Sequence, residues 1–282
     1  MWCGLIAVSS LAWFSASVAR QLLYPVRLPV PPDAPWPAHV THELTASDGR
    51  RFDAWLLEAP RPQGRIVLCH GYSADRWQVI GLADGLRQAG FEVVLIEMRG
   101  HGSRPGPCTL GLRETEDVQQ ALAWARGRGG TPATPTGAIG WSMGAVIACQ
   151  LARRDASVRA VVLDSPYACL LPVLRRAFAQ RYRWLPGTLV WPAWLILQAW
   201  LRAPLWRLDP IGLAPALGQP LLVIEGGQDR RVAPGMSQAL YMRWAGPKQR
   251  WHDPAVGHVG MFAAHPQEYC RRVTAHLQQA FA

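Results

Sequence analysis

Five short, almost continuously apolar runs recur between residues 65 and 226, and they constrain the fold more than any other feature of the sequence. The runs are RIVLCH, FEVVLIEM, TGAIGW, VRAVVLD and PLLVIEG. Strands without polar alternation are buried on both faces, which is typical of parallel strands joined by helical crossovers. The intervening residues 77–89, 112–126 and 145–154 have helical length. The sequence therefore predicts an α/β architecture with a mostly parallel central sheet and helices on both faces.

The N-terminal part of the chain lies outside this alternation. Residues 2–19 carry no charge and are at the lower length limit for a spanning helix. We therefore predict a membrane anchor or signal segment over residues 1–23. Six prolines follow within residues 24–39, and we expect a stiff linker over residues 24–40. The folded domain is then predicted over residues 41–282.

Two alternatives to an uncleaved anchor stay open. Ser17 and Ala19 would suit the small-residue cleavage site of a signal peptide, although the basic n-region of such peptides is missing. The segment could also be buried against the domain. The corresponding localisations are a membrane, with its side undetermined, or a secreted or periplasmic location after cleavage.

Residues 167–208 interrupt the alternation of strands and helices with a long, tryptophan-rich block. Its middle, WLPGTLVWPAWLILQAWL, has no ionisable side chain. A second membrane span is disfavoured because four prolines and Gly187 interrupt any long helix. We expect an insertion of short helices that folds over the strand ends as a lid, where it could cover an acyl pocket or rest on a bilayer surface.

The charge and the cysteines exclude several classes of protein. The formal net charge is +10, and Lys248 is the lone lysine among the cations. The arginines are scattered and do not alternate with aromatics, so we expect no nucleic-acid partner, whereas acidic lipid headgroups remain an alternative. The six cysteines show no metal-ligand spacing. Cys69 and Cys149 are expected in the core, without a disulfide framework.

The stretch Gly140-Trp141-Ser142-Met143-Gly144 has the spacing GxSxG. It lies between the predicted strand TGAIGW and the predicted helix GAVIACQLARR, which is the strand–turn–helix context that a nucleophilic serine requires. A side chain at either glycine would clash in so tight a turn. The serine then lies at a helix N-terminus, where unpaired N–H groups and the helix dipole favour negative charge. We predict that Ser142 is a nucleophile for acyl transfer, the alternative being a glycine-rich turn with an idle serine.

At this point the sequence resembles the α/β-hydrolase family from about residue 41 to the C-terminus. The resemblance rests on GxSxG, on His70-Gly71-Tyr72 after one strand, and on EMRGHGS at residues 97–103. Glu97 stands where the family usually has aspartate. The run TLGLRETEDV resembles a helix start in the membrane-anchored and prolyl-oligopeptidase-like branches. The resemblance implies the α/β-hydrolase fold with a helical lid, and a serine, an acid and a histidine in that chain order, without a cofactor or a metal.

The acid and the base are sought after the serine. Asp229 lies in the pattern GxxDxxVxP that usually carries the acid in this family, while Asp164 at the end of VRAVVLD is the rival. We favour Asp229 and expect Asp164 to cap the chain where it enters the insertion. His258, in VGHVGMF, matches the glycine–histidine loop and is the predicted base. His276 is expected to be exposed on the last amphipathic helix.

Two backbone N–H groups are expected to bind the oxyanion. The resemblance places one at Met143, which follows the nucleophile, and the other at Tyr72, in the loop after the third strand. Tyr72 could instead be only a wall of the pocket. His70 is expected to hold this loop structurally.

These residues together predict a serine hydrolase that cleaves carboxylic esters or thioesters through an acyl-enzyme. The Trp- and Leu-rich insertion favours a small-molecule or lipid-like ester with an apolar acyl group. A serine peptidase of the prolyl-oligopeptidase-like type is the first alternative, because the same triad cleaves amides. A membrane-tethered binding module is a second alternative, since a fold does not fix a function.

Overall fold

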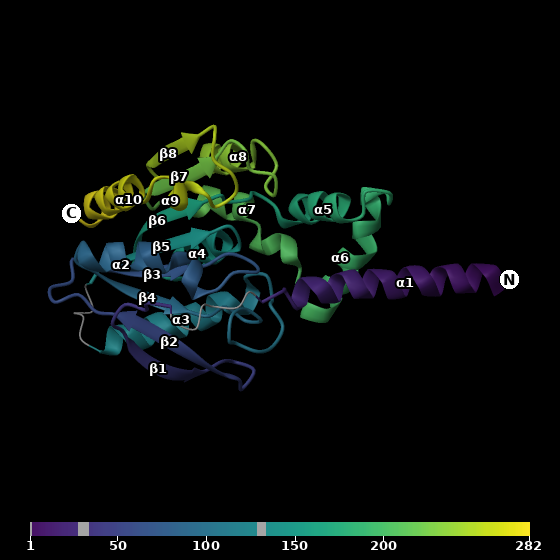
Figure 1. Ribbon diagram of the computed structural model, residues 1–282, viewed down its shortest axis with the longest axis horizontal. Coiled ribbons are helices and arrows are strands. Elements are labelled where there is room, and N and C mark those ends of the chain that lie inside the picture. Colours follow the sequence, from purple (N-terminus) through teal and green to yellow (C-terminus); the bar gives the residue numbers. More distant parts are fainter. Residues whose placement is uncertain (1, 28–33, 129–133) are drawn as a thin grey trace.

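A central eight-stranded sheet organises the described part of the chain (Figure 1). The computed structural model describes residues 2–27, 34–128 and 134–282, and for residues 2–8 it describes the backbone alone. The strand order is β1-β2-β4-β3-β5-β6-β7-β8. The strands are β1 (Val40–Thr45), β2 (Arg51–Leu57), β3 (Gly64–Cys69), β4 (Phe91–Ile96), β5 (Thr136–Trp141), β6 (Val158–Asp164), β7 (Leu221–Gly226) and β8 (Lys248–Asp253).

The sheet is mostly parallel, as predicted. Only the pairs β1–β2 and β2–β4 are antiparallel among the described strands, and the remaining neighbours run parallel. Every residue of β3, β4, β5 and β7 is buried, because these apolar strands are covered on both faces. In this register Cys69 pairs with Gly140, and Trp141 pairs with Asp164. The carboxyl ends of β3, β5 and β6 therefore meet at one edge, where ligands of such sheets gather.

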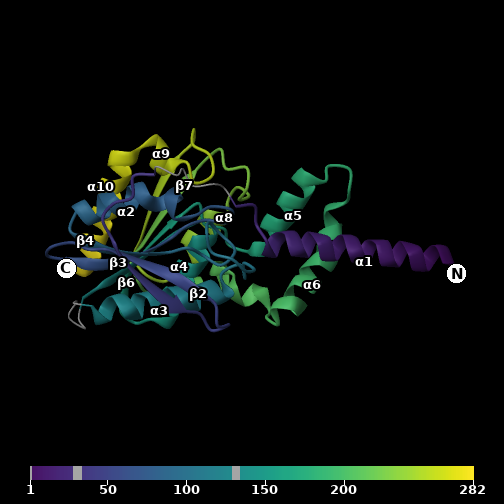
Figure 2. The same ribbon diagram turned by 60° about the horizontal axis from the view of Figure 1, so that its bottom comes forward.

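Helices cover the two faces of the sheet as separate layers (Figure 2). One buried cluster joins the sheet to α2 and α10, and a second joins the opposite face to α3, α4 and α8. The prediction of an α/β fold with helices on both faces is thus confirmed. The helices of the two layers are α2 (Ile80–Gln88), α3 (Leu112–Gly127), α4 (Met143–Arg154), α8 (Met236–Arg243), α9 (Met261–Ala264) and α10 (Pro266–Phe281).

The prediction that His276 is exposed is wrong. His276 is only 5% exposed and shares the inner face of α10 with Tyr269, Val273 and Leu277. Its spacing of three and seven residues from Val273 and Tyr269 places it on that apolar face. Burial there lowers the pKa of His276 below its ordinary value.

Residues 167–208, which we call the helical insertion, connect β6 to β7 at the carboxyl edge of the sheet. The insertion consists of the short helices α5 (Leu170–Arg181) and α6 (Val190–Leu201), with single 3₁₀ turns after each, and the small helix α7 (Pro210–Leu213) follows it. Leu174, Phe178 and Leu197 are buried in the core that the insertion shares with the sheet. The segment is helical and interrupted, as the prolines predict.

The first helix, α1 (Trp2–Leu23), projects from the body and packs its second half against the helical insertion (Figure 1). The ring of Phe14 lies 6.2 Å from that of Phe178 and 5.4 Å from that of Tyr182, both edge-on. Val18 and Ala19 are buried in the core. The part of α1 from Phe14 to Leu23 therefore packs against the insertion and the core, whereas residues 9–13 are exposed.

The predicted membrane anchor over residues 1–23 is not supported by the structure. Within residues 9–27, 34–128 and 134–282, whose side chains the structure describes, no helix combines the length and the apolar character that crossing a membrane requires, and residues 1–8 of the predicted anchor lie outside this finding. Met1 lies outside the described residues, as do residues 28–33 of the predicted linker.

Candidate active site

Ser142 occupies a strained turn between β5 and α4. Its backbone has φ of 54° and ψ of −110°, a conformation that residues with a side chain rarely adopt. A Cβ atom on Gly140 would lie 2.0 Å from the carbonyl oxygen of Gly144, and one on Gly144 would lie 2.2 Å from that of Cys69. Backbone atoms approach so closely at both positions that glycine is required, as the sequence predicts.

Ser142, His258 and Asp229 come together at the carboxyl edge of the sheet. The Oγ of Ser142 lies 2.9 Å from Nε2 of His258, and Nδ1 of His258 lies 2.6 Å from Oδ2 of Asp229. Asp229 follows β7, and His258 lies between β8 and α9. In the tautomer that satisfies both contacts, Nδ1–H donates to the carboxylate and Nε2 accepts the serine proton. The three residues that the sequence predicts as a triad are therefore linked by hydrogen bonds, from Ser142 to His258 and from His258 to Asp229.

The surroundings of Asp229 favour its ionised form. Burial alone would raise its pKa, but the hydrogen bonds from His258 and from two backbone N–H groups outweigh that effect and lower the pKa below its usual value. Those N–H groups belong to Arg231 and Val232, and both donate to Oδ1 at 2.8 and 2.9 Å. The carboxylate is thus fixed at both oxygens, with Oδ2 directed at the imidazole.

Asp164, the rival acid, forms no hydrogen bond with the imidazole of His258. It is fully buried, and its oxygens accept hydrogen bonds from the hydroxyls of Ser165 at 2.8 Å and of Tyr269 at 3.0 Å. Burial raises the pKa of Asp164 to about 6 in spite of these donors. The expectation that Asp164 caps the start of the insertion is also wrong, because its side chain is directed into the network beside α10.

This network braces the histidine loop. The Ser165 hydroxyl accepts a hydrogen bond of 2.9 Å from the backbone N–H of Val259, the residue after His258. Val259 itself has a φ of 55°. Sequence reasoning missed Ser165 and Tyr269, and the only local signal was the polar pair Asp164-Ser165 at a strand end.

The loop after β3 lies against the serine. A Cβ atom on Gly71 would be 3.6 Å from Cβ of Ser142, so the two turns are in contact. The Gly71 N–H donates to Gln78, whereas the N–H groups of Tyr72 and Met143 have no acceptor among the described residues. The role of these two N–H groups as oxyanion donors stays a prediction.

His70 holds this loop, as the sequence predicts. Its Nε2 accepts the backbone N–H of Met98 at 3.0 Å, and its Nδ1 lies 2.9 Å from the carbonyl oxygen of Gly71. Burial lowers the pKa of His70 to about 4, which keeps the ring neutral and able to accept. The loops after β3 and β4 are thereby tied together.

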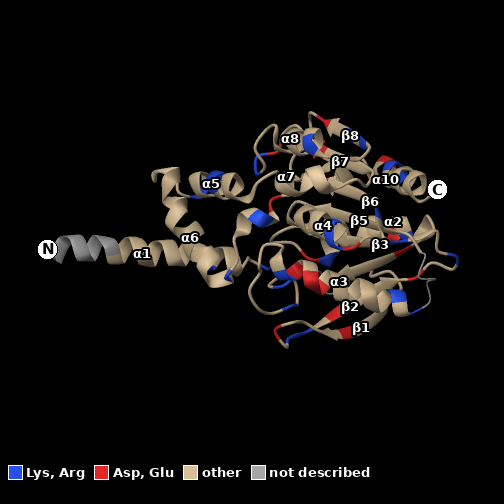
Figure 3. Ribbon diagram, turned by 180° about the vertical axis from the view of Figure 1, so that it is seen from behind, with Lys and Arg blue, Asp and Glu red and all other residues tan. Residues whose placement is uncertain are grey.

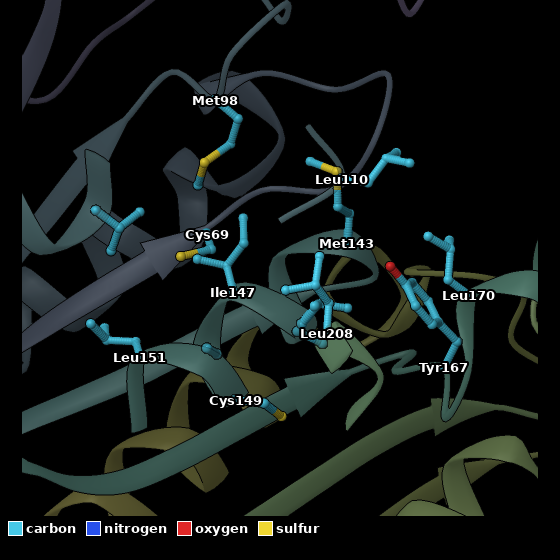
Figure 4. Close-up of a cluster of buried hydrophobic side chains, with 14 of the residues drawn as sticks. Cys69, Met98, Leu110, Met143, Ile147, Cys149, Leu151, Tyr167, Leu170 and Leu208 are labelled. Atoms are coloured by element: carbon cyan, nitrogen blue, oxygen red, sulfur yellow. The ribbon is translucent and has the colours of Figure 1, made fainter. Parts of the chain in front are cut away.

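The side chain of Met143 is buried in the core next to the turn that carries Ser142. It lies beside Leu110 in the buried cluster under the helical insertion (Figure 4). The thiol of Cys108 lies 3.7 Å from its sulfur. Because Met143 is only 2% exposed, packing fixes the position of its backbone N–H.

A cavity of about 530 Å³ opens onto Ser142 and His258. Its walls are largely apolar and come from α5 and from the last turn of α1, including Leu170, Leu174 and Leu22. Sequence reasoning missed Leu22, because it assigned that residue to an anchor segment. Arg181 and Arg231 are the charged residues among the described lining of this cavity.

No metal site accompanies these residues in the described ranges. Groups of three or more His, Cys, Asp or Glu side chains with suitable positions are absent there.

Comparison with known proteins agrees with the fold. A family model described as the alpha/beta hydrolase fold matches residues 64–193. An uncharacterized protein of Mycobacterium tuberculosis, Rv2307c, is 30% identical over 260 residues, which cover 90% of this chain and 85% of that protein. The monoacylglycerol lipase of Mycolicibacterium smegmatis is 28% identical over 237 residues, covering 72% of this chain and 84% of the lipase. The esterase Pf2001 of Pyrococcus furiosus shares the fold, with a TM-score of 0.73, 23% identity, and coverage of 92% of this chain and 100% of the esterase.

The chain therefore belongs to the α/β-hydrolase fold family. Within that family it is a hydrolase similar to enzymes of the esterase and lipase type.

Proposed function

We propose that this protein is a serine hydrolase that cleaves carboxylic ester or thioester bonds through an acyl-enzyme. The observation that carries the proposal is the chain of hydrogen bonds from Ser142 to His258 at 2.9 Å and from His258 to Asp229 at 2.6 Å. Ser142 and His258 line a cavity of about 530 Å³. A nucleophile, a base and an orienting acid within hydrogen-bond reach are the parts that acyl transfer needs.

In the proposed mechanism His258 takes the proton of Ser142 as Oγ attacks the carbonyl carbon. The carbonyl oxygen becomes an oxyanion that accepts hydrogen bonds from the N–H groups of Tyr72 and Met143. The protonated His258, stabilised by Asp229, then donates its proton to the leaving alcohol or thiol. Water repeats the sequence against the acyl-enzyme, and the same imidazole serves as base and acid. Each proton that His258 accepts is passed on, first to the leaving group and then back to Ser142, so the triad returns to its starting protonation.

The cavity favours an apolar acyl group. Leucine and valine side chains of α5 line the cavity that opens onto the serine, and burial of each methylene of an acyl chain there contributes about 0.8 kcal/mol. The similarity to a monoacylglycerol lipase agrees with such a substrate. We propose further that residues 41–282 form the catalytic domain and that the helical insertion serves as its lid.

A peptidase of the prolyl-oligopeptidase-like type remains the second candidate, because the same triad attacks amides. A peptidase that reads a free N-terminus needs a carboxylate near the serine, and the described cavity lining contains none. Parallel assays with a nitrophenyl ester and an aminoacyl nitroanilide of matched size separate the candidates. We expect turnover of the ester and little or none of the amide.

Labelling by a fluorophosphonate tests the proposal directly. We expect the wild-type chain to be labelled and the Ser142→Ala variant to remain unlabelled. Ser73→Ala is the matched control, because Ser73 lines the same cavity without a contact to His258. An unlabelled wild-type protein, or a labelled Ser142→Ala variant, would favour the binding module and contradict the proposal.

A further inference from the structure

Exposed large apolar side chains are concentrated at one end of the molecule. Across the described ranges, all but one of those that are strongly exposed belong to α1, to residues 24–26 or to the helical insertion. Trp184 is 82% exposed and Trp13 is 74% exposed. Met242 on α8 is the exception. The members of this surface are Leu11, Trp13, Tyr24, Val26, Trp184, Trp191, Leu195, Trp200 and Trp206.

The same end carries positive charge alone. Residues 167–208 contain arginines and no aspartate, glutamate or lysine, and residues 2–27 contain only Arg20 and Arg27 as ionised groups. Figure 3 shows blue and no red on α5, whereas the two colours mix over the sheet and its helices. The arginines of the insertion form no ion pair with a described carboxylate, in contrast with the buried pair of Arg99 and Asp117. They are Arg175, Arg176, Arg181, Arg183, Arg202 and Arg207.

We propose that residues 9–26 and the helical insertion form a lipid-binding surface that rests on an anionic phospholipid bilayer. Tryptophan concentrates at membrane interfaces, where its ring meets the acyl region and its N–H stays near water. Each arginine near an anionic leaflet contributes about 1 kcal/mol of attraction. An apolar surface of this extent on a soluble body marks an interaction site.

A bilayer fits this surface better than a second copy of the chain. In a twofold dimer the same arginines would face each other, with no acidic side chain within residues 167–208 to neutralise them. Phosphate groups offer that neutralisation together with an apolar layer beneath them. The partner is therefore identified by its combination of negative charge and hydrocarbon.

A second cavity links the surface to the candidate active site. This cavity, of about 300 Å³, lies between α1 and α5 and reaches Tyr24 and Val26 of the proposed surface. It shares Leu22, Tyr72 and Leu174 with the cavity at Ser142. A lipid ester could thus pass from the bilayer to Ser142 along apolar walls, a step that rests on the proposed function.

Vesicle co-sedimentation of the full chain tests the surface. Vesicles of phosphatidylcholine alone are compared with vesicles that also contain phosphatidylglycerol, at low and high salt. We expect binding to the anionic vesicles that weakens with salt, and weak binding to the neutral ones. The double variant Trp184→Ala/Trp206→Ala should bind at least about tenfold more weakly, because two interfacial rings are lost.

The charge is tested by Arg183→Gln/Arg207→Gln, for which we expect the preference for anionic vesicles to fall about tenfold or more. Met242→Ala/Arg243→Gln is the matched control, since it removes an exposed apolar side chain and an arginine on α8, away from the surface. Equal binding to both vesicle types, equal effects of control and surface variants, or self-association in place of vesicle binding would each overturn the proposal.

Two further measurements separate this proposal from the proposed function. Hydrolysis of a water-soluble butyrate ester should be unchanged in the surface variants, and Ser142→Ala should bind vesicles like the wild type. A wild-type protein that hydrolyses the ester but does not bind vesicles rejects the lipid-binding surface and leaves the proposed function intact. A wild-type protein that binds vesicles but hydrolyses no ester rejects the proposed function and leaves the surface intact.

Discussion

The hydroxyl of Ser165 accepts a hydrogen bond of 2.9 Å from the backbone N–H of Val259, and this contact joins the end of β6 to the loop that carries His258. The same hydroxyl donates to the buried carboxylate of Asp164. A side chain without a hydrogen bond to the triad side chains thereby holds the backbone next to His258. Ser165 is a positioning residue in the proposed mechanism.

Replacement of Ser165 by alanine should lower kcat about tenfold, with KM near the wild-type value. The variant leaves the Val259 N–H and one Asp164 oxygen without a buried partner, a loss of about 1–3 kcal/mol in the placement of the loop. Steady-state kinetics on a soluble ester measures the split. Ser157→Ala is the control, because Ser157 also donates to a carboxylate but lies at the opposite edge of the sheet. A purely structural role would lower stability in both variants and leave kcat unchanged.

Asp229→Asn should reduce kcat by several orders of magnitude, on the scale of ~10⁴ for triad acids. The amide would favour the wrong tautomer of His258, whose Nδ1 lies 2.6 Å from Oδ2. Asp164→Asn is the comparison, and we expect a far smaller loss because Asp164 has no hydrogen bond to the imidazole. A larger loss of kcat in Asp164→Asn than in Asp229→Asn would indicate that Asp164 is the acid of the triad.

The stability of the fold should depend on pH through Asp164. Its folded pKa of about 6 lies above the value of ~3.9 in an unfolded chain, so the native state binds more protons between these values. The free energy of unfolding therefore falls as pH rises through that window, by roughly 3 kcal/mol for this group. Denaturant unfolding at pH 4 and pH 7 measures the change. In Asp164→Asn the pH dependence should be correspondingly shallower, and an unchanged slope would contradict the assignment.

Gly144→Ala should destabilise the protein by more than the 1–3 kcal/mol typical of overpacking. Its new methyl group would lie 2.2 Å from the carbonyl oxygen of Cys69, and backbone cannot yield as a flexible side chain can. Thermal unfolding measures the loss. Gly187→Ala is the control, because nothing lies within 4 Å of the added Cβ there. Equal melting temperatures for the two variants would contradict the close approach of α4 to β3.

Leu22→Trp should restrict the enzyme to esters with shorter acyl groups. Leu22 lines the cavity that opens onto Ser142, and a larger ring there would occupy space that a long chain needs. We expect kcat/KM to fall about tenfold or more for long-chain esters, and to stay near wild type for acetate esters. The acetate ester is the internal control. A uniform loss across chain lengths would indicate damage to the fold instead.

Local sequence patterns predicted the residues whose roles depend on their neighbours in the chain. The apolar runs predicted the parallel sheet, the glycines around Ser142 predicted the strained turn, and the loop motif predicted His258. These signals are local because a tight turn or a buried strand restricts residue types directly.

Contacts between distant segments could not be predicted from the sequence. Tyr269 is 105 residues from Asp164, and its hydroxyl meets that carboxylate only after α10 has packed on the sheet. Leu22 had the same apolar character as an anchor, so composition could not reveal that it lines the cavity. His276 looked polar in the sequence, but its position on the inner face of α10 is set by packing.

The hydroxyl of Tyr72 donates to the carbonyl oxygens of Gln21 and Leu22 at 3.2 and 3.1 Å. The loop that carries the proposed oxyanion donor Tyr72 is therefore fastened to the last turn of α1. Removal of the residues up to Ala19 would take away the helical turns that hold those two carbonyl groups in place. Proteolysis near Ala19 would then lower turnover irreversibly, through carbonyl groups that lie about 50 residues before Tyr72 in the chain.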